Sequence, residues 1–253
     1  MPFHVVIPAR YGSLRLPAKA LLDIGGRPMI QWVVEQACRS SAEEVIVATD
    51  DTRIATVVTD PRGGKASLAV MTRTDHASGT DRIAEVAMLR GWSGNTLIVN
   101  VQGDEPQMPP QLINQVAGLL EADGRADIAT LCTPVTSREE FLDPNVVKVV
   151  RAADGAALYF SRAPIPWVRD AAVDATTAFA GAYRHLGIYA YRVSALLRLT
   201  SLPMSALESA EKLEQLRAME AGMRIAVGVA ATKPGIGVDT ADDIERLRRF
   251  FTS

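Results

Sequence analysis

The sequence predicts an α/β protein, and three features of the amino-acid pattern carry that prediction. In the first half, short runs rich in valine and isoleucine alternate with segments whose apolar residues recur at helical spacing. These runs are apolar at successive positions, as in strands that are buried on both faces of a parallel sheet. Beyond residue 126 the apolar runs follow one another more closely. We therefore expect a doubly wound, Rossmann-like, mostly parallel sheet with a mixed extension that contains antiparallel strands.

The predicted elements of the first half alternate strictly between strand and helix. Strands are expected over residues 5–7, 45–50, 68–71 and 96–101. Helices are expected from Met29 to Ala37, around Ile54 and Val58, from Ile83 to Leu89, and from Pro110 to about Glu121. Pro28 suits the first turn of the first of these helices.

The predicted elements of the second half are mostly strands. They cover residues 128–133, 146–151, 157–160, 184–191 and 225–229. Asp154-Gly155 is typical of a tight turn and joins two of these strands as a hairpin. One amphipathic helix is expected over 207–217, where apolar residues recur at helical spacing, and a last helix follows Thr240.

Length and composition limit the classes of protein to consider. A chain of 253 residues with 48% hydrophobic residues can bury a large core, and we expect one domain over 1–253 with approximate halves 1–125 and 126–253. The net charge of −2 gives no basic surplus for nucleic acid. No apolar run approaches the roughly 18 residues of a membrane span, and Met1–His4 does not open a signal peptide, so we expect a cytoplasmic protein without membrane insertion. Cys38 and Cys132 lack metal-site spacing and are expected to be free thiols.

The loop after the first strand carries the strongest functional signal. Arg10, Arg15 and Lys19 lie in it, with Gly12 and Ser13 among them. Because glycine lets the backbone approach a ligand, and because amides, hydroxyls and cations bind anionic oxygens, the loop suits a polyphosphate. Open α/β sheets also bind ligands at the carboxyl ends of their strands. The alternative is a solvated basic loop, and the spacing fits neither the Walker A motif nor the dinucleotide fingerprint.

Carboxylates near other strand ends offer metal ligands or helix caps. Asp104 follows the strand that ends at residue 101. A single carboxylate there suits Mg²⁺, which also binds substrate phosphates, and an ordinary turn aspartate is the alternative. Asp239 either caps the last helix or folds back to meet Asp104. For Asp50 and Asp51, capping of the following helix is favoured over metal binding.

Two further segments have both a structural and a functional interpretation. Ser78 or Thr80 can cap the helix that contains Ile83, and the same turn can present amides to a phosphate. His76 by itself indicates a surface histidine. Aromatic and basic residues between 159 and 191 suit sheet packing, a subunit contact or a sugar acid, because Arg pairs with carboxylates while His and Tyr bond hydroxyls.

Several motifs of this chain resemble those of sugar-activating nucleotidyltransferases, and more narrowly those of the 3-deoxy-manno-octulosonate (Kdo) cytidylyltransferases. The matching stretches are 8–19, 78–82, 100–106, 145–150, 157–162, 184–189, 213–217 and 237–240. The resemblance extends from Val5 to about Leu247. The departures are Leu14 in place of a usual threonine, Ala18 and Ala20 in place of a usual glycine and proline, and added residues around 61–65.

The resemblance implies a nucleotide-diphospho-sugar transferase fold and a specific reaction. CMP would pass from CTP to the anomeric hydroxyl of Kdo, giving CMP-Kdo and pyrophosphate and activating Kdo for lipopolysaccharide synthesis. Mg²⁺ is the implied cofactor and a homodimer the implied assembly. The first half would bind the nucleotide, while the second would bind the sugar and form the dimer.

The resemblance also implies a role for each site residue. Arg10, Ser13, Arg15 and Lys19 would hold the triphosphate, and Arg73, Ser78, Gly79 and Gln102 would approach the nucleotide or the sugar. The sugar pocket would be lined by Gln102, Arg162, His185, Tyr189, Glu214 and Gln215. Asp104 and Asp239 would bind the metal, and with Arg10 and Lys19 they form the implied catalytic set.

Two other functions stay open at this point. One is a cytidylyltransferase for a modified Kdo or for another sugar acid. The other is a nucleotide-binding module without turnover, which the retained cations and carboxylates disfavour.

Overall fold

The computed structural model describes residues 2–12, 18–58, 67–169, 179–235, 237–238 and 240–252. Within these ranges one mixed sheet has the order β11-β7-β10-β6-β1-β4-β5, with β8 paired to β10 and β9 paired to β8. Its strands are β1 (Phe3–Ala9), β4 (Glu44–Thr49), β5 (Ser67–Met71), β6 (Leu97–Asn100), β7 (Ile128–Pro134), β8 (Lys148–Arg151), β9 (Ala157–Ser161), β10 (Tyr183–Arg192) and β11 (Ile225–Val229). A separate small hairpin is formed by β2 (Asp23–Ile24) and β3 (Arg27–Pro28).

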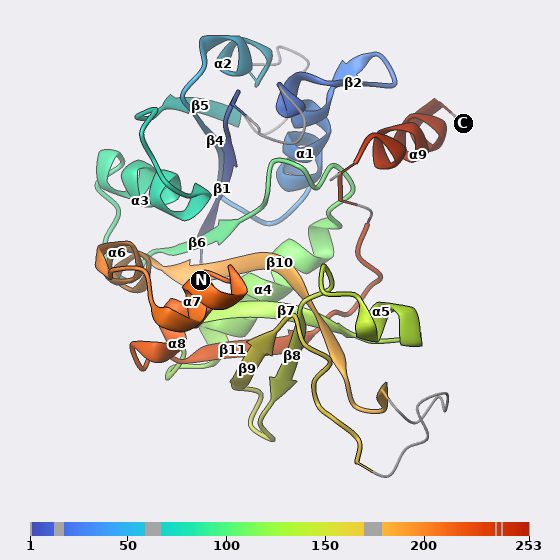
Figure 1. Cartoon of the computed structure of the whole chain (residues 1–253). Coiled ribbons are helices and arrows are strands. Elements are labelled where there is room, and N and C mark those ends of the chain that lie inside the picture. Colours follow the sequence, from blue (N-terminus) through green and yellow to red (C-terminus); the bar gives the residue numbers. More distant parts are fainter. Residues whose placement is uncertain are drawn as a thin grey trace.

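The sheet confirms the predicted combination of parallel and antiparallel strands. The first-half strands β1, β4, β5 and β6 are all parallel, and β7 pairs in parallel with β11. The long strand β10 joins these two parallel groups, because it runs antiparallel to both β6 and β7. The β8–β9 hairpin extends from the sheet at the lower side of Figure 1.

Helices cover both faces of the sheet (Figure 1). The helices are α1 (Met29–Cys38), α2 (Thr52–Val58), α3 (Gly79–Leu89), α4 (Pro110–Ala122), α5 (Arg138–Leu142), α6 (Val193–Ser201), α7 (Ala206–Glu211), α8 (Gln215–Glu220) and α9 (Ala241–Thr252), with a 3₁₀ turn η1 (Lys19–Leu21). In the described part of the chain, no helix has the length and apolarity that crossing a lipid bilayer requires.

Strand β1 shows why the apolar runs predict a doubly wound sheet. Successive strand side chains point to opposite faces. Val5 and Ile7 therefore join the apolar cluster formed with α1, α2 and α4, while Val6 joins the cluster formed with α3, α6 and α8. All three side chains are fully buried. A polar residue at any of these positions would face an apolar helix. This explains why polar and apolar residues do not alternate along the run.

Some elements differ from the predicted ones. The structure adds α5, α6 and the β2–β3 hairpin, none of which was predicted. The single helix predicted over 207–217 is wrong, because the chain forms α7 and α8 with a break at Lys212, whose φ is 54°. Apolar spacing continues through the break, so periodicity alone cannot detect it.

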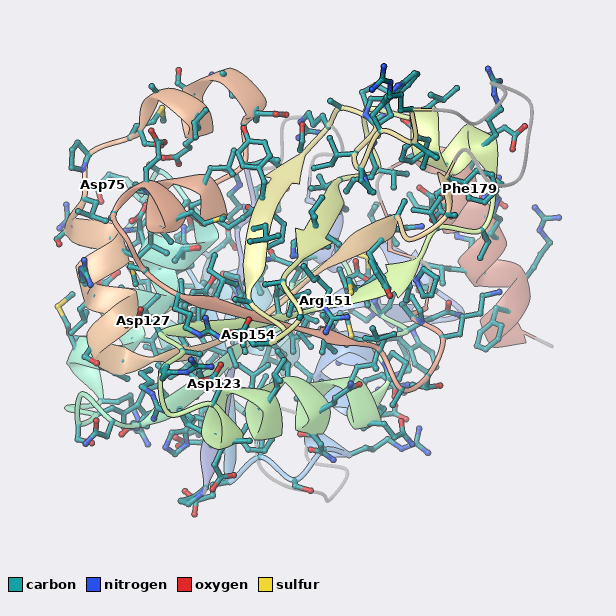
Figure 2. All side chains as sticks on the ribbon, turned by 90° about the horizontal axis from the view of Figure 1, so that it is seen from below. Asp75, Asp123, Asp127, Arg151, Asp154 and Phe179 are labelled. Atoms are coloured by element: carbon teal, nitrogen blue, oxygen red, sulfur yellow. The ribbon has the colours of Figure 1, made fainter. Side chains whose placement is uncertain are left out.

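At the amino ends of β7 and β11, a group of charged side chains holds three elements together (Figure 2). The backbone N–H of Arg224, just before β11, donates to Asp127 at 2.9 Å. Its guanidinium pairs with Asp154, in the β8–β9 turn, at 3.0 Å and with Asp123, after α4, at 3.4 Å. The group fixes the start of β11 relative to α4 and the hairpin.

A buried cation anchors the root of the β8–β9 hairpin. Lys148 is fully buried, and its Nζ donates to the backbone carbonyls of Asp143 at 2.8 Å, Val146 at 2.5 Å and Arg162 at 2.9 Å. The three carbonyls use all three N–H donors of the ammonium group. Burial lowers the pKa of Lys148 below its ordinary value. One side chain thus ties the segment before β8 to the residue that follows β9.

We predict that Lys148→Met destabilises the protein by about 3–5 kcal/mol, since it leaves three buried carbonyls without their charged donor. Urea unfolding measures this loss. The exposed Lys233 provides a matched control, because Lys233→Met should change the unfolding free energy by no more than about 0.5 kcal/mol. A Lys148→Met variant as stable as the control would show that these bonds contribute nothing to stability.

Candidate active site

Three segments meet at the carboxyl ends of β1 and β6, and Pro8 is their common contact. A Cβ added at Gly103, after β6, would lie 2.9 Å from the Pro8 carbonyl oxygen. A Cβ added at Gly79, at the start of α3, would lie 3.2 Å from Pro8 Cγ. Both glycines therefore allow a close approach that a larger residue would oppose. As a result the loop after β1, the loop after β6 and the first turn of α3 surround one space.

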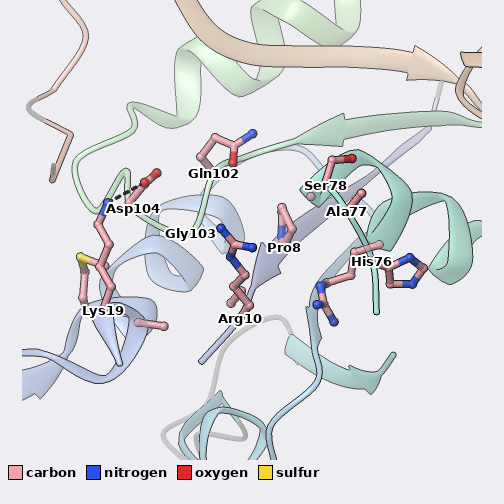
Figure 3. Close-up of a pocket in the computed structure, with 14 residues that line it drawn as sticks. Pro8, Arg10, Lys19, His76, Ala77, Ser78, Gln102, Gly103 and Asp104 are labelled. Atoms are coloured by element: carbon pink, nitrogen blue, oxygen red, sulfur yellow. Dashed lines mark hydrogen bonds and ion pairs between the residues drawn. The ribbon is translucent and has the colours of Figure 1, made fainter. Parts of the chain in front are cut away.

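That space is a pocket of ≈ 420 Å³, shown in Figure 3. Figure 3 places Arg10 between Lys19 on one side and His76 on the other, with Gln102 and Asp104 above. All five residues line the pocket. The structure therefore brings together two of the predicted triphosphate cations, the predicted metal ligand Asp104 and the predicted contact Gln102.

Lys19 and Asp104 form an ion pair in this pocket, with Nζ and Oδ2 2.8 Å apart. The Lys19 side chain is 13% exposed and that of Asp104 is 39% exposed, so the carboxylate is open to a ligand. Ala18 precedes Lys19 in a left-handed conformation with φ 55°. This conformation costs an alanine roughly 1–2 kcal/mol and explains why a glycine would suit the position.

The first turn of α3 forms another wall of the pocket. Ser78 caps the helix by accepting from the N–H of Asp81 at 3.1 Å, and the Asp81 carboxylate accepts in return from the N–H of Ser78 at 3.0 Å. The predicted capping role of Ser78 is confirmed. Ser78 and Gly79 both line the pocket, at a helix terminus whose amides favour anions.

The two aspartates after β4 take structural roles. Asp51 caps α2 by accepting from the N–H of Arg53 at 2.9 Å, as predicted. Asp50 pairs with Arg82, which is 3% exposed, at 2.8 Å. Arg82 lines the pocket, and its charge is already paired with Asp50. Its position was not predicted, because a single arginine within a helical pattern gives no signal of burial.

His76 is the main correction to the sequence analysis. The prediction of a surface histidine is wrong: its side chain is 14% exposed and lines the pocket. Its Nε2 makes a short bond with the Glu85 carboxylate, which also accepts from the N–H of Arg73 at 3.0 Å. Glu85 lies on α3, nine residues away, so only the folded helix brings the two together.

A second, smaller pocket of ≈ 60 Å³ adjoins the first, and Gln102 lines both. Three of the predicted sugar-pocket residues, Tyr189, Glu214 and Gln215, line it as well. The break between α7 and α8 brings Glu214 to this wall, since Glu214 immediately precedes α8. Three other polar residues of this lining were not predicted as site residues: Thr80, Asn100 and Tyr191.

The second pocket is a buried, polar environment. Desolvation raises the pKa of the Glu214 carboxyl, while the Thr80 hydroxyl and the Arg217 guanidinium oppose that shift. Burial likewise raises the pKa values of the Tyr189 and Tyr191 phenols, so both stay neutral donors. The walls thus offer one carboxylate acceptor together with neutral hydroxyl and amide groups, which suits a polyhydroxylated ligand.

Two predicted site residues, Arg73 and Arg162, lie away from both pockets. Arg73 is exposed and pairs with Asp75 at 2.5 Å. Arg162 donates through Nε to the carbonyl of Glu211 at 2.7 Å and through Nη1 to that of Pro144 at 2.9 Å. Their predicted substrate contacts remain predictions that require these side chains to move.

His185 lies behind the wall of the second pocket. Its ring centroid is 5.3 Å from that of the lining residue Tyr189, and its Nε2 is 2.9 Å from Thr130 Oγ1. Phe160 meets the ring edge-on at 5.0 Å. Desolvation lowers the pKa of His185 to about 3, so the ring is neutral at physiological pH.

The predicted residues Ser13, Arg15 and Asp239 lie outside the described residues. The segment before Asp239 packs on the Asp104 loop, because the N–H of Val238 donates to the Asp104 carbonyl at 2.9 Å. A Cβ added at Gly237 would lie 2.7 Å from Glu105 Oε1. The Gly-Val stretch thus runs directly along the loop that carries Asp104.

We predict that His185 makes the protein less stable in acid. An unfolded histidine gains its proton near pH 6.5, whereas folded His185 stays neutral until about pH 3, so the unfolded state binds more protons between these values. Stability therefore falls as the pH drops through this window, by about 2 kcal/mol between pH 7.5 and pH 5.

The matched comparison is His185→Gln, which cannot titrate and keeps a polar end for Thr130. Chemical unfolding at both pH values should show that the wild type loses about 2 kcal/mol more than the variant. The pKa of His4 is also lowered by burial, but His4 is present in both proteins and cancels. Identical pH dependence in the two proteins would contradict a His185 that is neutral in the folded state.

Sequence comparisons identify related proteins. Residues 4–225 match the family model described as Cytidylyltransferase. The chain is 53% identical to the 3-deoxy-manno-octulosonate cytidylyltransferase of Thioalkalivibrio sulfidiphilus over 250 residues, which cover 98% of each chain. It is 51% identical over 258 residues to the protein of the same name from Nitrosococcus oceani, covering 100% of this chain and 98% of the relative.

Comparison with solved structures agrees as well. The structure of CMP:2-keto-3-deoxy-manno-octonic acid synthetase complexed with CTP matches 100% of this chain and 99% of its own, with a TM-score of 0.88 and 43% identity. The fold alone is shared with 4-diphosphocytidyl-2C-methyl-D-erythritol synthase, at a TM-score of 0.63 and 12% identity. On these comparisons, the chain belongs to the family of 3-deoxy-manno-octulosonate cytidylyltransferases.

Proposed function

We propose that this protein transfers CMP from CTP to the anomeric hydroxyl of Kdo and releases pyrophosphate. The observation that carries the proposal is the pair of adjoining pockets. One contains Arg10, Lys19 and the α3 N-terminus, and the other contains Glu214 among neutral hydrogen-bonding groups. The first suits a polyphosphate and the second suits sugar hydroxyls. Gln102 lines both, so the two substrates would meet at this residue.

The chemistry is a displacement at the α-phosphorus of CTP. The anomeric oxygen forms a bond to phosphorus while the bond to the bridging oxygen of pyrophosphate breaks. Such a reaction needs in-line positioning and neutralisation of charge rather than covalent help from the protein. Arg10 and Lys19 would bind the triphosphate and stabilise the leaving pyrophosphate, and the amides at the start of α3 would orient an anionic oxygen.

The residues present also fit a divalent metal. The Asp104 carboxylate already binds one cation, the Lys19 ammonium, and remains 39% exposed in the pocket. Mg²⁺ binds through one or two carboxylates plus substrate phosphates, so Asp104 and Asp239 would be sufficient. When bound, Mg²⁺ would neutralise the α-phosphate and help to activate the attacking hydroxyl. Lys19 would then be released from Asp104 and could pair with phosphate oxygens.

Each half of the chain would bind mainly one of the two substrates. We assign the nucleotide to the half formed by residues 1–125 and the sugar mainly to residues 126–253. Thr80, Asn100 and Gln102 of the first half also line the second pocket. A homodimer through the second half and a cytoplasmic location stay predictions.

Release of pyrophosphate tests the proposed function directly. The purified protein is assayed with CTP and Kdo in the presence of Mg²⁺, then with UTP or ATP in place of CTP, and with sialic acid or an amino-substituted Kdo in place of Kdo. Release that requires CTP and is fastest with Kdo is the expected result. Faster turnover of another sugar acid would reassign the acceptor, and no release with any pair would contradict an enzymatic function.

We predict that Asp104→Asn raises the Mg²⁺ concentration needed for half-maximal turnover and lowers kcat by orders of magnitude. The change keeps the shape of the side chain and removes its charge. Titration of Mg²⁺ in the pyrophosphate assay measures both effects.

Asp154→Asn is the matched control for this variant. Asp154 is 47% exposed and pairs with Arg224 at 3.0 Å, so the control loses a comparable ion pair far from the pockets. It should keep the Mg²⁺ dependence and the kcat of the wild type. Asp104→Asn with that same behaviour would remove Asp104 from the metal site.

A further inference from the structure

Thr80 connects the two pockets. It is 4% exposed and lies in the first turn of α3. Its neighbours Ser78 and Gly79 line the larger pocket, whereas Thr80 lines the smaller one. The first turn of this helix is therefore a wall that both pockets share. The capping function of the turn belongs to Ser78, which leaves the Thr80 hydroxyl available for another role.

The Thr80 hydroxyl fixes the carboxylate of Glu214. Thr80 Oγ1 donates to Glu214 Oε2 at 2.5 Å, and Arg217 Nη2 donates to Glu214 Oε1 at 2.8 Å. The two carboxylate oxygens are thus held from two helices, Oε2 from α3 and Oε1 from α8. Because an ionised carboxylate has about four lone-pair sites, Glu214 keeps acceptor capacity for a ligand.

Polar side chains surround this contact on the wall of the smaller pocket. Gln102 Nε2 donates to Asn100 Oδ1 at 3.4 Å, and both residues line the pocket together with Tyr191. The carboxylate of Glu214 therefore lies among side-chain amide and hydroxyl groups that can also hydrogen-bond a ligand.

The size and charge of the smaller pocket determine which part of a ligand it takes. Its ≈ 60 Å³ are well below the roughly 150 Å³ of a cavity that binds benzene, so the pocket takes only a small part of a ligand. The Glu214 carboxylate accepts hydrogen bonds and repels another carboxylate. A sugar acid would therefore enter with its hydroxyl-bearing end toward Glu214, leaving its own carboxylate nearer the cations of the larger pocket.

We propose that Thr80 is a positioning residue for the acceptor: its hydroxyl holds the Glu214 carboxylate in the orientation that accepts the hydroxyls of the sugar acid. The inference rests on the proposed function, because it assigns the smaller pocket to the acceptor. Thr80 does not touch the nucleotide pocket, so its hydroxyl affects the acceptor and leaves the binding of CTP unchanged.

The test compares Thr80→Val, which keeps the shape and removes the hydroxyl, with Thr80→Ser, which keeps the hydroxyl. Pyrophosphate release at saturating CTP gives KM for Kdo and kcat, and calorimetry gives the dissociation constant for CTP. We expect Thr80→Val to raise KM for Kdo about tenfold or more, with the affinity for CTP unchanged. Thr80→Ser should restore KM to near the wild-type value.

A double-mutant cycle with Glu214→Gln identifies the group through which Thr80 acts. In the Glu214→Gln background the bond from Thr80 loses its charged acceptor, so the additional effect of Thr80→Val on KM for Kdo should shrink. Should Thr80→Val fail to fold, Thr80→Ala removes the same hydroxyl with a better helix former and gives the same readouts.

Two results would overturn the inference. An unchanged KM for Kdo in Thr80→Val would show that the hydroxyl does not position the acceptor. Equal losses of affinity for CTP and Kdo would show that Thr80 only holds the start of α3. Failure of the proposed function looks different, because the wild-type protein would then release no pyrophosphate from CTP and Kdo.

Discussion

The close packing around Pro8 is the constraint on which the site depends. Gly103 approaches the Pro8 carbonyl and Gly79 approaches its ring, so two segments from distant parts of the chain are fixed against the end of β1. Only this approach brings the cations that follow β1, the carboxylate of Asp104 and the first turn of α3 to one space. The site is therefore a property of the sheet edge, where parallel strands end together, rather than of any single loop.

The charged side chains around that space differ in how deeply they are buried and in whether they form ion pairs. Arg82 is buried and already paired with Asp50, so its role is structural. Lys19 is paired with the more exposed Asp104, and both can exchange this contact for a substrate or a metal. Arg10 is exposed at the pocket. In the adjoining pocket the single carboxylate, Glu214, is held by donors from two helices, which suits hydroxyls rather than phosphates.

The sequence predicts the sheet well because buried strands and strand ends follow local rules. The apolar run at 5–7 and the position of Asp104 after β6 need only strand geometry and the rule for parallel sheets. Contacts between distant residues cannot be read in this way. His76, before α3, contacts Glu85 on α3, nine residues further along the chain. Thr80 contacts Glu214, which lies 134 residues further along. The break at Lys212, which brings Glu214 to its pocket, is equally hidden, since a lysine gives no signal for a positive φ.

The central claim is that the approach of Gly103 to Pro8 assembles the nucleotide pocket, and calorimetric binding of CTP to Gly103→Ala tests it most directly. The added methyl group would lie 2.9 Å from the Pro8 carbonyl oxygen, so the loop that carries Asp104 must shift. Gly118→Ala is the control, because a Cβ there meets nothing within 4 Å. The account predicts a folded Gly103→Ala protein with clearly weakened CTP binding and a control that binds as the wild type does. Wild-type affinity in Gly103→Ala would contradict it.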